Sequence, residues 1–203
     1  MSKFADYSLE KFNKELSSDA PTPGGGSVAG LSASLSAALI QMVINLTDDS
    51  SLNDYNEKLT KKRKEALDLI DKDAESFKKV MKAFKMPKST DDEKQKRTKS
   101  IQEGLYGASL TPLDTMKLAL KLLEIAREVI EKGNPHAISD IGVAGLMAMS
   151  SIKGARLNVL INTQSLKDHK KAKKLEIEAE EILKKGERLL EDIEEITENK
   201  IKN

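Results

Sequence analysis

The sequence contains no cysteine, no tryptophan and only 2 histidines among its 203 residues. Without cysteine the chain can form no disulfide, no thiolate metal site and no cysteine nucleophile. The two histidines, His136 and His169, are far apart, and neither has a second ligand at metal-binding spacing. Acid–base chemistry would therefore depend on carboxylates, and no metal site is expected.

An excess of charge of one sign is also lacking, because 34 Lys and Arg residues stand against 33 Asp and Glu residues, a formal net charge of +1. A nearly neutral chain has no molecule-wide field that would favour nucleic acid as a partner. The first residues show no basic start followed by an apolar stretch, so no secretion signal is indicated and a cytoplasmic location is expected. The most apolar segment, 27–46, is interrupted by serines, Gln41 and Asn45, which favours a buried helix over a membrane span.

Strand-like alternation is nearly absent, and apolar residues recur at helical spacing along most of the chain. We therefore predict an all-α fold in which residues 1–203 form a single-domain bundle of long helices. Expected N-caps are Ser8, Ser27 and Ser139, and Thr90 is expected to begin a capping box. The predicted helices are 9–19, 27–46, 52–84, one from Thr90, one with Pro112 in its first turn that stops at 133–135, 139–163, and one from 167 onward.

One carboxylate falls on a helix face that is otherwise apolar. The same-face neighbours of Asp73 are Leu69, Ile70, Phe77, Val80 and Phe84. Asp71, in contrast, shares its face with charged residues and is expected to be an ordinary solvated carboxylate. A buried ionised carboxylate is costly unless it is paired, protonated or placed in a cleft. The pattern favours a structural ion pair and a functional acid about equally for Asp73.

A later helix carries small and polar residues along one edge. This edge comprises Asp140, Ala144, Met147, Ser151, Gly154, Ala155, Asn158, Asn162 and Ser165. An amide-lined groove between this helix and a neighbour could orient a planar polar ring. A polar seam between two packed helices explains the same pattern, so both interpretations stay open.

Three consecutive glycines, Gly24, Gly25 and Gly26, precede Ser27 and the apolar helix. Glycine N–H groups at a helix N-terminus are unobstructed by Cβ and lie at the positive end of the helix dipole, which suits an anion or a carbonyl. The segment lacks the Gly-Lys-Ser/Thr ending of a phosphate-binding loop, and no strand precedes it. Because glycines also let two helices cross closely, the pattern alone favours a ligand cradle and a helix crossing equally.

Four segments, in this order, resemble the cyclodeaminase/cyclohydrolase family of folate enzymes: APTPGGGSVAG, DKDAESFKKVMKAFKMPKST, RTKSIQEGLYGASLTPL and SDIGVAGLMAMSSIKGARLNVLIN. The family includes the C-terminal half of formiminotransferase-cyclodeaminase and stand-alone methenyltetrahydrofolate cyclohydrolases. The resemblance covers nearly the whole chain, with glycine at Gly30 and Gly145 where alanine is commoner. It implies an all-helical, cyclodeaminase-like homodimer or higher homo-oligomer that binds a reduced folate, with no metal, nicotinamide or other permanently bound cofactor.

The resemblance also implies roles for individual residues. Asp73 matches the aspartate of the family's D-A-E-S-F block and would be the acid–base residue. The substrate-binding positions would be Gly24, Gly25, Gly26, Ser27, Asp140, Asn158 and Asn162. The implied reaction is cyclodeamination of 5-formiminotetrahydrofolate to 5,10-methenyltetrahydrofolate and ammonia, and hydrolysis of the methenyl compound to 10-formyltetrahydrofolate is the alternative. A non-catalytic helical interaction protein, in which Asp73 is an ion pair, is the remote alternative.

Overall fold

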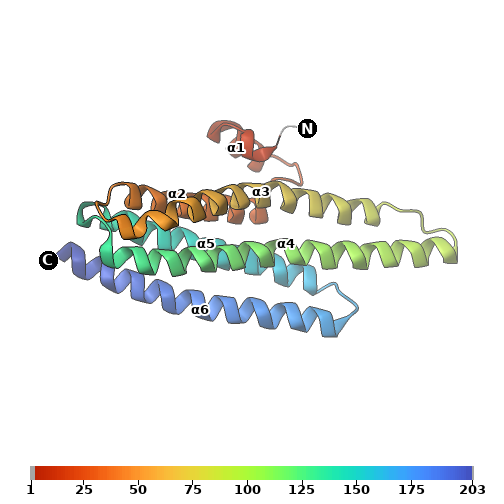
Figure 1. The fold of residues 1–203 in the computed structure, drawn as a ribbon. Helices are drawn as coiled ribbons and strands as arrows, with labels where there is room; N and C mark the ends of the chain where they lie inside the picture. Colours follow the sequence, from red (N-terminus) through yellow and green to blue (C-terminus); the bar gives the residue numbers. More distant parts are fainter. Residues whose placement is uncertain (1–2, 203) are drawn as a thin grey trace.

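The computed structural model describes residues 3–202, and no strand occurs within that range. Its α-helices are α1 (Leu9–Leu16), α2 (Gly25–Asn45), α3 (Asn53–Phe84), α4 (Asp91–Lys132), α5 (Ile138–Thr163) and α6 (His169–Lys202). Short 3₁₀ segments precede three of them: η1 (Phe4–Asp6), η2 (Ser50–Leu52) and η3 (Pro135–Ala137). The prediction of an all-α bundle of long helices is confirmed (Figure 1).

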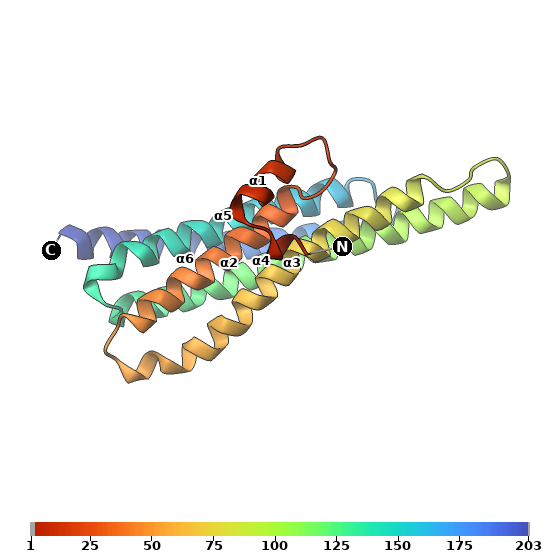
Figure 2. The ribbon, with the colours of Figure 1, turned by 90° about the horizontal axis from the view of Figure 1, so that it is seen from above.

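The long helices α2 to α6 lie side by side in one elongated bundle, with α1 across its outer surface (Figure 1). Helix α2 packs against α3 and α5, and α4 packs against α3, α5 and α6. The C-terminal part of α3 and the N-terminal part of α4 extend together beyond the other helices as a two-helix arm (Figure 2). This arrangement leaves the N-terminal end of α2 next to the base of the arm.

Helices α2 and α5 supply much of the core because small residues let their neighbours approach closely. Fully buried side chains include Ala33, Ala37, Ile40 and Val43 of α2 and Ile141, Ala144, Ala148 and Ile152 of α5. By length and composition α2 could cross a membrane, with a mean hydropathy of 1.7 in its most apolar window, and 61% of that window is buried inside the bundle. The prediction that this segment forms a buried helix is therefore confirmed.

Two predicted caps are confirmed and two are wrong. The Ser8 hydroxyl accepts the N–H of Lys11, and Thr90 forms a full capping box at the start of α4. Ser27 is not an N-cap, because the N-cap of α2 is Gly24, three residues earlier, and the Ser27 hydroxyl donates to the Ile70 carbonyl of α3 at 3.0 Å. Ser139 lies inside α5, since η3 leads directly into that helix.

Helix α4 is continuous, where the sequence predicted two helices separated near Pro112. Pro112 lies buried in the interior of α4. Proline lacks an N–H and therefore cannot donate to the carbonyl of Ala108, one turn earlier. The helix continues because buried residues on both sides of the proline, including Leu105 and Leu113, hold it against the bundle. Tertiary packing thus overrides the local signal for a helix start.

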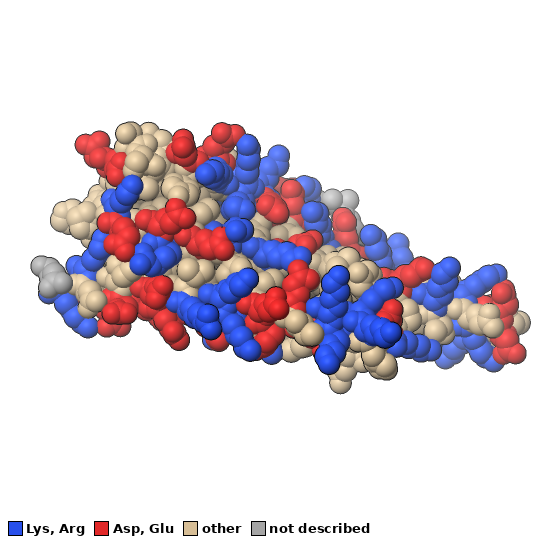
Figure 3. Space-filling model, turned by 60° about the horizontal axis from the view of Figure 1, so that its bottom comes forward, with Lys and Arg blue, Asp and Glu red and all other residues tan. Residues whose placement is uncertain are grey.

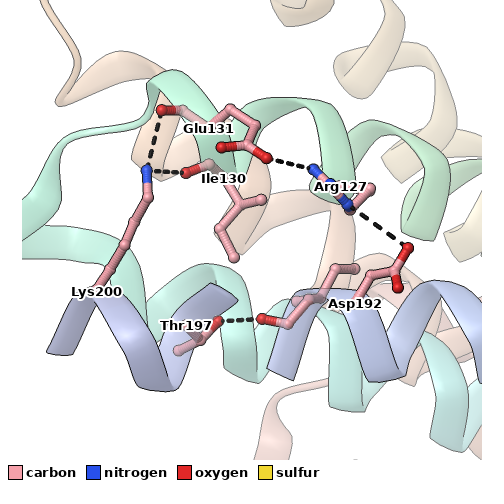
Figure 4. Close-up of polar contacts among 7 residues, drawn as sticks. Arg127, Ile130, Glu131, Asp192, Thr197 and Lys200 are labelled. Atoms are coloured by element: carbon pink, nitrogen blue, oxygen red, sulfur yellow. Dashed lines mark hydrogen bonds and ion pairs between the residues drawn. The ribbon is translucent and has the colours of Figure 1, made fainter. Parts of the chain in front are cut away.

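Polar side chains fix α6 to the C-terminal end of α4 (Figure 4). Lys200 Nζ donates to the carbonyls of Ile130 at 2.8 Å and Glu131 at 3.0 Å, which have no donor within the helix. Arg127 lies 2.8 Å from Glu131 and 3.8 Å from Asp192, and so links the two helices. Of the residues predicted on the inner face of α6, Leu175, Ile182 and Ile193 are buried and Leu189 is partly buried.

Candidate active site

A cavity of about 270 Å³ lies where the N-terminal end of α2 meets α3, α4 and α5. It is lined by Pro21, Thr22, Gly24, Gly25, Gly26, Asp73, Phe77, Ala108, Asn158, Ile161 and Asn162. Six of the eight site residues predicted from the sequence therefore lie around one space, although they come from three separate segments of the chain.

The glycine segment forms the first turn of α2. Gly24 is the N-cap, with extended backbone angles, and its carbonyl accepts the N–H of Val28 at 3.0 Å. The N–H groups of the next residues have no acceptor within the helix and lie at the positive end of its dipole. They provide hydrogen-bond donors on the cavity side for an anion or a carbonyl.

Close approach of helices, rather than an unusual backbone conformation, requires glycine at Gly26. No glycine among residues 3–202 has a positive φ. A Cβ on Gly26 would lie 2.6 Å from Oδ2 of Asp73 and closer still to Oδ1, whereas one on Gly24 would meet nothing within 4 Å. One turn later, a Cβ on Gly30 would lie 3.2 Å from the carbonyl oxygen of Ala66. The glycines thus bring α2 close to α3 and at the same time open the helix N-terminus to the cavity.

Asp73 is half-buried and faces the N-terminal end of α2. Burial raises the pKa of the Asp73 carboxyl above its ordinary value, and hydrogen bonds from Ser27 oppose this shift only in part. The Ser27 hydroxyl lies 3.4 Å from Asp73 Oδ2. No Lys, Arg or His of residues 3–202 forms an ion pair with Asp73, so the structural ion pair allowed by the sequence pattern is not formed.

Asp71 is not the solvated carboxylate that the helical pattern predicted. Its Oδ1 accepts the N–H of Phe4 at 2.7 Å, and its Oδ2 is buried without a hydrogen-bond partner among the described residues. The segment around η1 covers this side of α3, where Lys3 also pairs with Asp68 at 3.1 Å. Helical periodicity describes only the helix itself and gives no sign of a segment that packs over it from 67 residues away.

The covering segment also encloses a second cavity, of about 730 Å³, between η1, the loop before α2 and α3. Pro21 and Thr22 line both this cavity and the candidate active site. The loop that carries them therefore forms a wall between the two spaces.

The two asparagines of α5 point their amides toward neighbouring carbonyls. Asn158 Nδ2 donates to the Gly154 carbonyl at 2.9 Å, and Asn162 Nδ2 donates to the Ala108 carbonyl of α4 at 2.9 Å. A Cβ on Gly25 would lie 3.7 Å from Asn158 Nδ2, so this amide lies directly beside the glycine turn. Each of these hydrogen bonds uses one N–H of the amide, so the amide oxygen remains as an acceptor for a ligand, together with one further N–H.

Ser27 and Asp140 do not line the cavity. Ser27 is fully buried behind Gly26, where it contacts Asp73 and the Ile70 carbonyl. Asp140 is in the first turn of α5, 18 residues before Asn158, which places it about 27 Å away along the helix axis. The small and polar edge of α5 runs along the whole helix, and a Cβ on Gly154 of this edge would lie 3.8 Å from Cβ of Ala29 on α2. The opposite face of α5 packs on α6, as the contact of Gly142 with Thr197 shows.

Several cavity residues were not among the sequence-predicted site residues. Phe77, one turn after Asp73, was expected only as an apolar neighbour, and Ile161 and Ala108 were not expected. A signal for Ala108 was present, because Pro112 four residues later must leave its carbonyl without a helical donor.

The cavity combines one desolvated carboxyl, free N–H donors, amide acceptors and the aromatic ring of Phe77. Such a set can bind a planar polar ring and exchange a proton with it. Within residues 3–202, no group of three or more His, Asp or Glu side chains is placed to hold a metal ion.

Comparison with known sequences places this arrangement among folate enzymes. The sequence profile described as Formiminotransferase-cyclodeaminase matches residues 8–181. Methenyltetrahydrofolate cyclohydrolase of Methylorubrum extorquens is 38% identical over 201 residues, which cover 95% of this chain and 97% of that protein. Formimidoyltransferase-cyclodeaminase of Rattus norvegicus is 33% identical over 171 residues, which cover 80% of this chain and 32% of the rat protein. The chain thus corresponds to only part of the rat protein.

The fold also matches a solved structure. The crystal structure of formiminotetrahydrofolate cyclodeaminase from Thermotoga maritima superposes with a TM-score of 0.85 at 28% sequence identity. The superposition covers 96% of this chain and 97% of the Thermotoga chain, so the two share one fold over essentially their whole length.

Proposed function

Because the chain belongs to the formiminotransferase-cyclodeaminase family, we propose that it is an enzyme acting at the one-carbon bridge between N5 and N10 of tetrahydrofolate. The observation that carries this proposal is the position of Asp73: a half-buried carboxyl without a cationic partner, beside the N-terminal end of α2 and in the wall of the cavity. A carboxyl of this kind can exchange protons with a bound ring and can stabilise an amidinium-like carbon.

The first candidate reaction is cyclodeamination of 5-formiminotetrahydrofolate. N10 attacks the carbon of the protonated formimino group and loses its proton to Asp73. Asp73 then passes this proton to the formimino nitrogen, and the bond from the carbon to that nitrogen breaks, which releases ammonia. The product is 5,10-methenyltetrahydrofolate. Burial favours this role, because the raised pKa of Asp73 lets its protonated form persist to higher pH than that of a solvated aspartate.

Cyclohydrolysis is the second candidate, and the 38% identity to a cyclohydrolase over nearly its full length favours it. Here water attacks the cationic methenyl carbon and ionised Asp73 accepts a proton from it. The bond from this carbon to N5 then breaks as Asp73 returns its proton to N5, and the added hydroxyl loses its proton to solvent, which leaves a formyl group on N10. Both reactions need the same carboxyl at the same carbon, so the two candidates share one site.

The lining of the cavity fits the pterin ring. The amide oxygens of Asn158 and Asn162 can accept from N–H groups on the ring edge, Phe77 offers an apolar face, and the N–H groups of Gly25 and Gly26 can meet a carbonyl. A volume of about 270 Å³ is below the usual range for a whole drug-sized ligand, so the rest of the folate would extend beyond the cavity.

The charge distribution favours an anionic ligand at this end of the molecule. Residues 78–103, which form most of the two-helix arm, carry 9 Lys and Arg against 4 Asp and Glu, and residues 167–174 carry 5 Lys against 1 Asp. Figure 3 shows the Lys and Arg side chains along the arm. Positive potential here would attract the carboxylates of the glutamate portion of folate.

Turnover of both compounds by the purified protein tests the proposal. If the protein is a cyclodeaminase, we expect the methenyl absorbance to appear from the 5-formimino compound, with one ammonia released per molecule. If it is a cyclohydrolase, we expect loss of the methenyl absorbance and no reaction with the formimino compound. Inertness toward both, with no thermal stabilisation by either folate, would contradict the proposal and favour a helical interaction protein.

We also propose that the protein is a homodimer formed through an apolar face of α2 and α5. Exposed apolar side chains recur there at helical spacing: Leu35 and Met42 of α2 with Leu46 at its C-cap, and Val143, Leu146, Leu157 and Ile161 of α5. Exposed apolar side chains gathered on one face of a helix are typical of a protein interface. The partner that fits this face is a second copy of the same chain. Two copies related by a two-fold axis through the face would cover the exposed residues of α2 and of α5 in both copies at once.

Leu157→Glu is expected to convert the dimer into a monomer in light-scattering measurements, because the side chain is 64% exposed on this face but does not line the cavity. The matched control is Leu9→Glu on α1, where a leucine that is 74% exposed lies outside the face, and no change in mass is expected. A wild-type protein that is monomeric at the same concentration would rule out this interface.

A further inference from the structure

A proline inside α4 frees a carbonyl at the candidate active site. Pro112 has no N–H, so the Ala108 carbonyl has no donor from the following turn. Ala108 lines the cavity, and its carbonyl instead accepts from Nδ2 of Asn162 on α5 at 2.9 Å. A carbonyl of one helix is thereby satisfied by a side chain of another.

The other polar groups near the proline are satisfied within or next to α4. The Ser109 hydroxyl donates to the Leu105 carbonyl at 2.9 Å, and the Thr115 hydroxyl donates to the Thr111 carbonyl at 3.2 Å. The Thr111 hydroxyl is 3.1 Å from that of Ser76 on α3. The Ala108 carbonyl differs, because its hydrogen bond comes from a residue that also faces the cavity.

We propose that Pro112 is a positioning residue: it leaves the Ala108 carbonyl open to anchor Nδ2 of Asn162, and it thereby fixes which atom of that amide faces a ligand. With its nitrogen held by Ala108, the planar amide offers Oδ1, an acceptor. The group bound there is an N–H donor. The identity of the ligand rests on the proposed function, and a tetrahydropterin ring carries N–H donors along its edge.

Pro112→Ala restores an N–H that competes for the Ala108 carbonyl. We expect KM for the folate substrate to rise roughly three- to tenfold, the size of one hydrogen bond, with kcat changed by less than about twofold. Pro112→Val, which also supplies an N–H but keeps more of the buried volume, should give the same result. The matched control is Leu113→Val, which perturbs the packing next to the proline without supplying a donor, and its KM should stay that of wild type.

A double-mutant cycle separates positioning from a general packing effect. In an Asn162→Ala background, Pro112→Ala is expected to raise KM no further, because the group that it positions is already absent. Additive effects of the two substitutions on KM would overturn the proposal.

The Asn162 side-chain amide can be observed directly by NMR without any substrate. We expect its two N–H signals to shift and to exchange faster with solvent in Pro112→Ala, and to be unchanged in Leu113→Val. Unchanged signals in Pro112→Ala would overturn the proposal. Wild-type inertness toward both folates would reject the proposed function instead, and the NMR result would still decide the role of Pro112.

Discussion

Asp73→Asn is expected to lower kcat by about 100- to 10,000-fold, the usual contribution of a general acid or base. Asparagine keeps the shape of the side chain and still accepts a hydrogen bond from Ser27, but it can neither take nor give a proton. Helical content and oligomeric mass should remain those of wild type. The measurement is turnover of the formimino and methenyl compounds, and near-native kcat would remove Asp73 from the mechanism.

The same substitution, which lowers kcat, is expected to raise the free energy of unfolding at neutral pH. Because burial raises the pKa of Asp73, the folded state binds this proton more tightly than the unfolded chain, where the pKa is 3.8. The free energy of unfolding of the wild type should therefore fall as the pH rises from 3.8 through the folded-state pKa, and should stay lowered above it. The asparagine variant lacks this penalty and should be the more stable protein at neutral pH.

Melting curves from acid to neutral pH check this expectation. The difference in melting temperature between variant and wild type should be largest at neutral pH and should vanish below the unfolded-state pKa. A variant that is less stable than the wild type at neutral pH, with unaltered folate binding, would instead indicate a purely structural role for Asp73.

Local signals in the sequence were sufficient for most of the fold. The capping residues Ser8 and Thr90, the stop at Gly133 and the long amphipathic patterns all depend on nearby residues, and the structure confirms them. The break predicted at Pro112 was wrong because the packing of α4 against four helices, α2, α3, α5 and α6, outweighs the local cost of a proline. Ser27 failed as a cap for a related reason, since its hydroxyl bonds to α3 instead of to its own helix.

The candidate site was predicted where one residue breaks the pattern of its own helix. Asp73 stands out because a carboxylate on an apolar face requires an explanation, and the structure places it in the cavity wall. Asp140 shares the polar edge of α5 with Asn158 and Asn162 but lies in the first turn of the helix, away from the cavity, and periodicity cannot tell which end of a long helix faces which neighbour. Its substrate-binding role follows from the family resemblance and stays a prediction. Asp71 is covered by the segment around η1, which lies far from it in the sequence, and a single sequence does not reveal such a contact.

Gly26→Ala is expected to lower kcat by roughly 100-fold or more with only a small change in melting temperature. The added Cβ would overlap the carboxyl group of Asp73, reaching within 2.6 Å of Oδ2. The atoms in conflict are the end of a side chain that can rotate, so the carboxyl moves aside at little cost to folding. A displacement of about 1 Å is enough to cost two orders of magnitude in rate when geometry is critical.

Other glycines provide a graded comparison under the same assay. Gly25→Ala should have a smaller effect on kcat, because its Cβ would make only an ordinary contact, 3.7 Å from Asn158 Nδ2. Gly107→Ala on the exposed side of α4, where a Cβ meets nothing within 4 Å, should leave kcat unchanged and stabilise the helix by about 0.5–1 kcal/mol.

Comparing the loss of kcat with the change in melting temperature across these variants separates two roles of the glycine turn, positioning of Asp73 and close packing of α2 on α3. If Gly26→Ala reduces kcat while the folded fraction stays at the wild-type level, the turn holds α2 at the distance that places Asp73 against the substrate. If it lowers the melting temperature strongly while each folded molecule keeps its kcat, Gly26 serves only the crossing of α2 and α3. The proposed position of Asp73 in catalysis would then lose its geometric basis.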